Sequence, residues 1–100
     1  MEKVTNWEDV GLITSSTYRK RVLERVQKPN MPSILSKELN LNKTHISRAL
    51  KELLNKALIE CKNPKTTKGR IYEITTYGKK VLKEAEAVYG EKGKVRFGED

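Results

Sequence analysis

The sequence predicts one mainly α-helical domain with a small β-hairpin, an α+β fold. The chain has 100 residues, and this length accommodates a single hydrophobic core. Several segments repeat apolar residues every three or four positions, which is the spacing of one face of a helix. Two short alternating runs flank a polar loop with Pro64 and Gly69, a pattern typical of a β-hairpin.

Residues 1–15 contain scattered apolar side chains, and we expect them to form a short helix or an arm that lies on the domain. Ser15 or Ser16 can cap the next helix. Pro29 and Pro32 end that helix, because proline cannot continue it. Its apolar stripe consists of Tyr18, Val22 and Val26.

Two further helices are predicted in the middle of the chain. Ser33 caps a short helix, and the segment Asn40–Asn42 makes a tight break after it. The clearest amphipathic pattern then covers Lys43–Lys56, with a polar and basic opposite face. Its inward face consists of Ile46, Ala49, Leu50, Leu53 and Ala57.

The hairpin and a last helix follow. Strands are expected at Leu58–Cys61 and Arg70–Thr75, and Thr75 or Thr76 can cap the last helix. The domain is therefore expected to cover residues 16–89.

The last residues, 90–100, turn to glycine and charge, which predicts a flexible tail.

The charge balance predicts a polyanionic partner. Lys and Arg number 21 against 13 Asp and Glu, which leaves a net charge of +8. Such an excess on a small domain points to nucleic acid or an anionic membrane. No apolar run approaches the roughly 18 residues that cross a bilayer, and the N-terminal residues lack the pattern of a secretory signal. We therefore expect a cytoplasmic protein.

The residue counts argue against catalysis and metal binding. His45 is the single histidine and Cys61 the single cysteine, whereas a structural zinc site takes four nitrogen or sulfur ligands. A Cys–His nucleophile pair is disfavoured because the two lie in a polar helical face and a strand-like run. The sequence has no glycine-rich phosphate loop. We expect no enzyme activity, no metal and no cofactor.

The order of helix, short helix, tight turn and amphipathic helix is that of a helix-turn-helix. The second helix of this motif presents donors to the major groove while its other face packs on the core. Asn42, Lys43 and Thr44 open this helix, where backbone N–H groups favour a phosphate. The basic hairpin loop follows directly. These features together predict a DNA-binding domain.

In this order and spacing, the segment SILSKELNLNKTHISRALKELLNKALIE, a polar basic loop and RIYEITTYGKKVL resemble winged-helix transcriptional regulators of the MarR and ArsR type. The resemblance covers about residues 17–88. It implies a winged helix-turn-helix with a three-helix core, a wing and a C-terminal helix. It also implies that Lys43–Lys56 is the recognition helix and Lys62–Arg70 the wing.

Three features depart from that family. Many relatives have glycine where this chain has Ala57. Because a left-handed alanine costs about 1 kcal/mol, we expect this helix to end differently. The wing has Lys68, Gly69 and Arg70 in place of the frequent Asp-Arg pair, which leaves its geometry open. The cysteine pairs of metal-sensing relatives are absent, so metal sensing does not carry over.

The predicted function is a sequence-specific transcriptional regulator that binds double-stranded DNA. Arg48 is the strongest candidate for a base contact, because a guanidinium pairs bidentately with guanine. For His45 and Ser47 the alternative is a solvated helix surface, and for Thr44 a cap of its own helix. Lysines would hold phosphates, and the wing would follow the backbone or enter a minor groove. The predicted DNA-binding residues are Asn42, Lys43, Thr44, His45, Ser47, Arg48, Lys51, Lys62, Lys65, Lys68 and Arg70.

Two other functions remain open at this stage. Winged helices also serve as protein-interaction or RNA-binding modules of transcription or RNA machinery, and the fold does not decide between these roles. The basic wing and the polar recognition face favour DNA. Binding to an anionic membrane surface is disfavoured because the core needs every apolar face.

A homodimer is expected, because one winged helix contacts about half a site and twofold dimers bind half-sites about 34 Å apart. The alternative is that the N-terminal arm folds over the last helix within one chain. A small-molecule effector, if one exists, would bind in a crevice between helices or at the dimer interface. The apolar residues expected in that interface are Trp7, Val10, Leu12, Ile13, Val81, Leu82, Ala85, Val88 and Tyr89.

Overall fold

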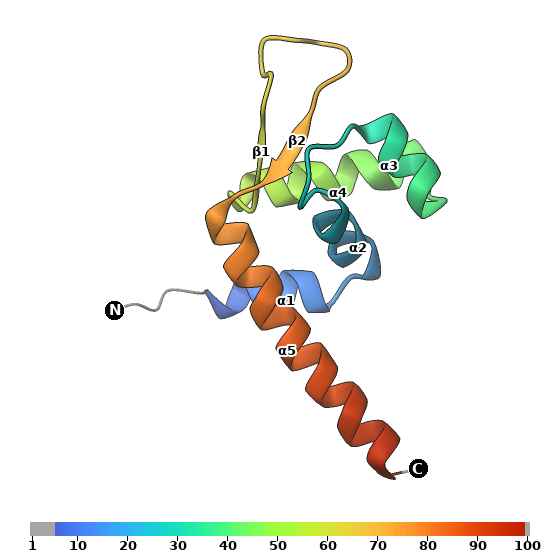
Figure 1. Cartoon of the computed structure of the whole chain (residues 1–100), viewed down its shortest axis with the longest axis vertical. Helices are drawn as coiled ribbons and strands as arrows, with labels where there is room; N and C mark the ends of the chain where they lie inside the picture. The colour runs from blue at the N-terminus through green and yellow to red at the C-terminus, as the bar shows by residue number, and fades with distance from the viewer. Residues whose placement is uncertain (1–5, 100) are drawn as a thin grey trace.

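The computed structural model describes the backbone of residues 6–99 and the side chains of residues 6–88. Over this range it has five helices and a two-stranded antiparallel sheet (Figure 1). This confirms the predicted mainly α-helical fold with a hairpin. The elements are α1 (Trp7–Thr14), α2 (Thr17–Arg25), α3 (Pro32–Leu39), α4 (Lys43–Asn55), β1 (Ile59–Cys61), β2 (Tyr72–Ile74) and α5 (Thr76–Glu99).

Most helices begin where a side chain can accept from a free backbone N–H. Ser16 caps α2, and Asn42 caps α4 by accepting from the His45 N–H at 2.9 Å. The prediction that Ser33 caps α3 is wrong. Pro32 is the first residue of that helix instead, and its missing N–H needs no partner there.

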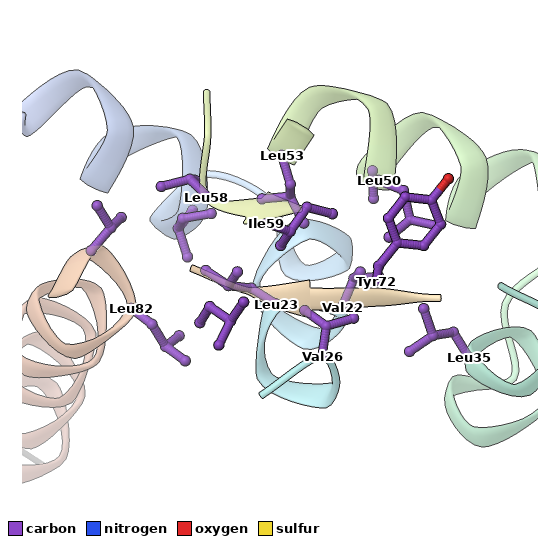
Figure 2. Close-up of a cluster of buried hydrophobic side chains, with 14 of the residues drawn as sticks. Val22, Leu23, Val26, Leu35, Leu50, Leu53, Leu58, Ile59, Tyr72 and Leu82 are labelled. Atoms are coloured by element: carbon purple, nitrogen blue, oxygen red, sulfur yellow. The ribbon is translucent and has the colours of Figure 1, made fainter. Parts of the chain in front are cut away.

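A single apolar cluster joins the helices to the hairpin (Figure 2). Val22 and Leu23 of α2 and Val26 at its C-cap lie at the centre of the cluster and are fully buried. Side chains from α3, α4, α5 and both strands surround them. This arrangement buries one face of α4 and leaves its other face at the surface.

Strand β2 is hydrogen-bonded along both of its edges. On one edge it pairs with β1 in the register Ile59↔Ile74. On the other edge Asn30 and Tyr72 exchange two backbone hydrogen bonds, of 3.0 and 2.8 Å, and the Ile74 N–H donates to the Val26 carbonyl at 2.8 Å. The segment between α2 and α3 therefore extends the sheet by a short bridge. Both strands are shorter than predicted.

Helix α4 ends in a left-handed residue, and the expectation that Ala57 avoids this conformation is wrong. Ala57 has φ +60°. Its N–H donates to the Leu54 carbonyl at 2.9 Å, and the Leu58 N–H donates to the Leu53 carbonyl at 3.0 Å. These are the two hydrogen bonds of a Schellman motif, which usually has glycine at this position. The two bonds hold the alanine in its unfavourable conformation.

The start of α5 is packed directly against that turn. Thr75 donates its hydroxyl to the Ala57 carbonyl at 2.7 Å and accepts from the Gly78 N–H at 2.9 Å, so Thr75 is the cap of α5. A Cβ on Gly78 would lie 2.0 Å from the Leu58 carbonyl oxygen. Glycine is needed here because the two backbones approach too closely for any side chain.

Helix α1 packs against α5 and α2 of the same chain. This is the alternative to a dimer interface, in which the N-terminal arm folds over the last helix within one chain. The buried Asp9 accepts from the Tyr77 hydroxyl at 2.5 Å, and its other oxygen lies 3.9 Å from Lys56 Nζ. Burial, followed by the hydrogen bond to this carboxylate, raises the pKa of Tyr77. Helix α1 is thus tied by polar contacts both to α5 and to the end of α4.

Most of the apolar residues assigned to a dimer interface are already buried within one chain, so that part of the prediction is wrong. The sequence alone indicates surplus apolar surface here, because it does not show that α1 packs on α5. Trp7 stays 69% exposed, whereas Leu12 and Val88 are half-buried. The side chain of Tyr89 lies outside the described residues. The residues buried within the chain are Val10, Ile13, Val81, Leu82 and Ala85.

Helix α5 continues to Glu99, beyond Gly90, where the sequence predicts the start of a flexible tail. Each interior glycine costs a helix about 1 kcal/mol relative to alanine. Extension of an existing helix nevertheless adds one backbone hydrogen bond per residue and needs no new nucleus. The backbone of residues 90–99 is helical in the structure.

Candidate nucleic-acid interface

The exposed face of α4 carries the predicted recognition residues. Its apolar face, formed by Ile46, Ala49, Leu50 and Leu53, is buried against the core. The opposite face is therefore turned to solvent. Asn42, at the cap, is exposed but uses its side-chain oxygen to hold the helix start. The exposed residues of the helix face are Lys43, Thr44, Ser47, Arg48 and Lys51.

His45 lies between this exposed face and helix α2. It is half-buried, and its ring stacks on that of Tyr18 with centroids 4.6 Å apart and an interplanar angle of 21°. The prediction that Tyr18 belongs to the apolar inner stripe of α2 is wrong, because the side chain is 41% exposed. Tyr18 stands in the first turn of α2, where that face is no longer covered by the core.

The wing projects from the fold at the end away from α5, with α3 and α4 near its base (Figure 1). Gly69 has φ +67°, a left-handed conformation that glycine adopts without strain. Asn63, which sequence reasoning missed, organises the loop. Its side-chain amide donates to the Gly69 carbonyl at 3.1 Å, and its oxygen accepts from the Ile71 N–H at 2.7 Å. An Asn just after a strand is the signal that was available.

A hollow of about 320 Å³ joins the wing to the two helices of the helix-turn-helix. Lys43 and Ser47 of α4 and Thr67 and Arg70 of the wing line it, together with Ser33 near the start of α3. The structure therefore brings together predicted residues that lie 27 positions apart, from Lys43 to Arg70. Cations and hydroxyl donors around one hollow suit a phosphate group.

The four predicted wing cations differ in their surroundings. Lys62 Nζ lies 3.2 Å from Glu60 and 3.5 Å from Glu73, and the hydrogen bond to Glu60 is the main reason that the pKa of Lys62 is raised. Arg70 donates from Nε to the Thr66 carbonyl at 2.7 Å. Lys65 and Lys68 are exposed. The carboxylates of Glu60 and Glu73 thus offset part of the positive charge of Lys62, whereas the charges of Lys65 and Lys68 face solvent.

A second hollow, of about 220 Å³, lies between α2 and α4. The Tyr18–His45 stack and Arg48 line it, and so does an ion pair between Arg19 and Glu52 that sequence reasoning missed. Arg19 Nε lies 2.7 Å from Glu52 Oε1. The hydrogen bond from Arg19 is the main cause that lowers the pKa of Glu52. The two residues are 33 positions apart, and no local pattern connects them.

Comparison with known proteins finds likeness in structure. No protein-family model matches the chain, and no curated protein matches it by sequence. The regulator BldR from Sulfolobus solfataricus aligns with a TM-score of 0.74 and 22% identity over 93% of this chain and 69% of BldR. A MarR-family transcription regulator aligns at 0.68 and 23% identity over 90% of this chain and 63% of that one.

A third structure is a mutant of MarR from E. coli, complexed with operator DNA. It aligns with a TM-score of 0.67 and 21% identity over 85% of this chain and 66% of the MarR chain. The chain has a MarR-type winged-helix fold. At these identities the likeness concerns the fold, and the chain spans less than two thirds of the length of two of these three proteins.

Two further observations bear on function. Among residues 6–88, no group of three or more His, Cys, Asp or Glu side chains is placed to hold a metal ion. In the same part of the winged helix, no helix is both long and apolar enough to cross a membrane. The similar structures are transcription regulators.

Proposed function

We propose that this winged helix is a sequence-specific regulator of transcription that binds double-stranded DNA through α4 and the wing. The observation that carries the proposal is the hollow that Lys43, Ser47 and Arg70 share. It lies beside the exposed polar face of α4, so a helix in the major groove and a wing on the flanking backbone can act together. The MarR structure that is complexed with operator DNA, which has the same fold, supports the proposal of DNA binding.

The roles proposed for the residues follow their surroundings. Arg48, with Thr44 and Ser47 on the same exposed face, reads base edges. His45 presents only part of its ring, because Tyr18 covers one side of it. Exposed basic residues hold phosphates. These are Lys43, Lys51, Lys65, Lys68 and Arg70, while Lys62 contributes less and Asn42 acts through the helix start.

The test is selection of bound sites from random duplexes, followed by affinity measurements with Arg48→Ala. We expect the loss of about 1–3 kcal/mol at one base position and a smaller loss on random duplex. Lys51→Ala, one turn of helix away on the exposed face, is the matched control. It should weaken all duplexes alike, because a phosphate contact carries no sequence information.

Two outcomes would contradict the proposal. If no sequence is enriched and binding to random duplex does not depend on salt, the wing and α4 serve a protein partner instead. If Arg48→Ala weakens every duplex equally, Arg48 contacts a phosphate and the assignment of base reading is wrong.

The proposal includes a homodimer and a cytoplasmic location, where such a regulator meets its DNA. Helix α5 supports a dimer, because its distal half extends beyond α1 and the rest of the domain (Figure 1). Trp7 adds an exposed apolar side chain on α1. Sedimentation equilibrium tests this part, since a mass near 11.5 kDa would contradict a dimer. A small-molecule effector would act at that interface or between the helices.

A further inference from the structure

Two residues of opposite charge lie one turn apart on the recognition helix. Arg48 and Glu52 are separated by four positions on α4 and line the same hollow. Side chains at this spacing are neighbours on a helix surface and pair when their charges are opposite. Such a pair would occupy the Arg48 guanidinium and hold it along the helix.

The carboxylate of Glu52 is instead bound by Arg19 of helix α2. Arg19 Nε lies 2.7 Å from Oε1 and Arg19 Nη2 lies 3.5 Å from Oε2, an arrangement in which both carboxylate oxygens are engaged. Within the described part of the chain, Glu52 makes this ion pair and makes none with Arg48.

Arg19 is itself held from another direction. Its Nη1 donates to the Leu12 carbonyl near the end of α1 at 2.9 Å and to the Ser15 hydroxyl at 3.4 Å. The side chain is 22% exposed and that of Glu52 is 36% exposed. Arg19 is therefore fixed by two groups besides Glu52, and a guanidinium fixed in this way loses little further freedom when it binds Glu52.

We propose that Arg19 is a positioning residue for DNA recognition, which holds Glu52 away from Arg48 and so leaves the Arg48 guanidinium available for a base. This inference rests on the proposed function. The hydrogen bond from Arg19 is the main cause that lowers the pKa of Glu52, and the charge of Arg48 adds a smaller lowering, so the carboxylate already interacts with Arg48 without forming an ion pair with it. Without Arg19 the Glu52 carboxylate forms an ion pair with Arg48, and DNA must break this pair before Arg48 can bind guanine.

The expected effect is modest and specific. When Arg19 is removed, DNA must break an exposed ion pair between Arg48 and Glu52. Affinity for the preferred site should therefore fall by about two- to fivefold. Affinity for random duplex should fall less, because there Arg48 makes no base contact. The ratio of the two affinities is therefore the quantity to measure.

The experiment compares Arg19→Gln, Glu52→Gln and the double variant with the wild-type chain, on the selected site and on random duplex. Arg19→Gln should lower the affinity ratio, and Arg19→Gln with Glu52→Gln should restore it. Glu52→Gln alone should leave the ratio at the wild-type value. Arg25→Ala is the control, since it removes one positive charge from an exposed position of α2 outside this hollow.

Urea unfolding checks that each variant is folded, and Arg19→Lys serves as the conservative variant. An ammonium group keeps the positive charge but cannot engage both carboxylate oxygens, so its affinity ratio should lie between those of the wild type and Arg19→Gln. A ratio as low as that of Arg19→Gln would overturn the inference.

The outcomes separate the inference from the proposed function. If the wild-type chain prefers no sequence, the proposed function fails. If the wild-type chain prefers a site but Arg19→Gln leaves the ratio unchanged, or the double variant stays as weak as Arg19→Gln, then Arg19 has only a structural role and the inference fails.

Discussion

Helix α4 lies next to the start of α5 at its C-terminal end and next to the wing on its exposed face. These two contact regions differ in how closely they are packed and in what holds them. At the C-terminal end of α4, Ala57 and Leu58 are bonded to Thr75, and Gly78 lies so close that its missing Cβ is required. The wing, by contrast, is exposed over Pro64–Arg70 and is held mainly by its own turn. Stability depends on the first contact region, and the charges proposed to meet DNA lie on the second. The two properties can therefore be changed independently.

The largest expected effect is on the buried contact region. Gly78→Ala places a Cβ 2.0 Å from the Leu58 carbonyl oxygen and 2.9 Å from the Leu58 carbonyl carbon, and backbone cannot yield as a side chain can. We expect a loss of about 3 kcal/mol or more in the free energy of unfolding. Urea unfolding monitored by circular dichroism measures it.

Gly11→Ala is the matched control, because a Cβ added in α1 meets no atom within 4 Å. It should stabilise the chain by about 0.5–1 kcal/mol, the usual gain for alanine inside a helix. Equal effects at the two glycines would show that the close approach at Gly78 is not the cause.

The wing should respond in DNA affinity and not in stability. The triple variant Lys65→Ala, Lys68→Ala and Arg70→Ala should reduce the slope of log K against log salt by up to about 2.7 per subunit, at about 0.9 for each lost phosphate contact. Its urea midpoint should stay close to that of the wild type. Fluorescence anisotropy over a salt series measures the slope.

Lys62→Ala tests the distinction within the wing. Glu60 and Glu73 already offset part of the positive charge of this lysine, so the slope should change by well under about 0.9. If Lys62→Ala matches the effect of a tip lysine, then the strand carboxylates do not limit its contact with DNA.

A small effect on stability is expected at Ala57, and it has the opposite sign to that of Gly78→Ala. Glycine adopts φ +60° without strain, so Ala57→Gly should stabilise the fold. The gain should be about 0.5–1 kcal/mol, because the added freedom of glycine in the unfolded chain offsets part of it. A lower free energy of unfolding in this variant would mean that the Schellman turn does not strain the alanine.

The sequence predicted the features that depend on residues close together in the chain, namely helix periods, caps and the turn of the hairpin. The period of α4 could be identified, and the cap of α2 could be narrowed to Ser15 or Ser16, because each involves residues within one or two turns. The hairpin could be placed because Gly69 marks its turn. The hollow that joins Lys43 to Arg70 follows from the fold that these elements imply.

The errors concern contacts between distant segments. Tyr18 fits the period of its helix, yet it lies beyond the edge of the core and stacks on His45. Nothing near Arg19 signals a partner 33 residues away. The apolar residues of α1 and α5 look like surplus surface until the two helices are seen to pack together. Ala57 adopts the left-handed conformation because the two hydrogen bonds of the Schellman motif outweigh its conformational cost. The preference of alanine for other conformations, which is all that the sequence shows, does not include these hydrogen bonds.

The bridge between Asn30 and Tyr72 has a consequence for how the molecule holds together. It ties β2, and α5 after it, to the segment that precedes the helix-turn-helix, without using the wing. A protease that cut the wing would leave two fragments. The Asn30–Tyr72 bridge, the β1–β2 pairing and the packing of α1 on α5 would still hold them together. Such a nicked protein would remain one particle in native buffer and separate only in denaturant.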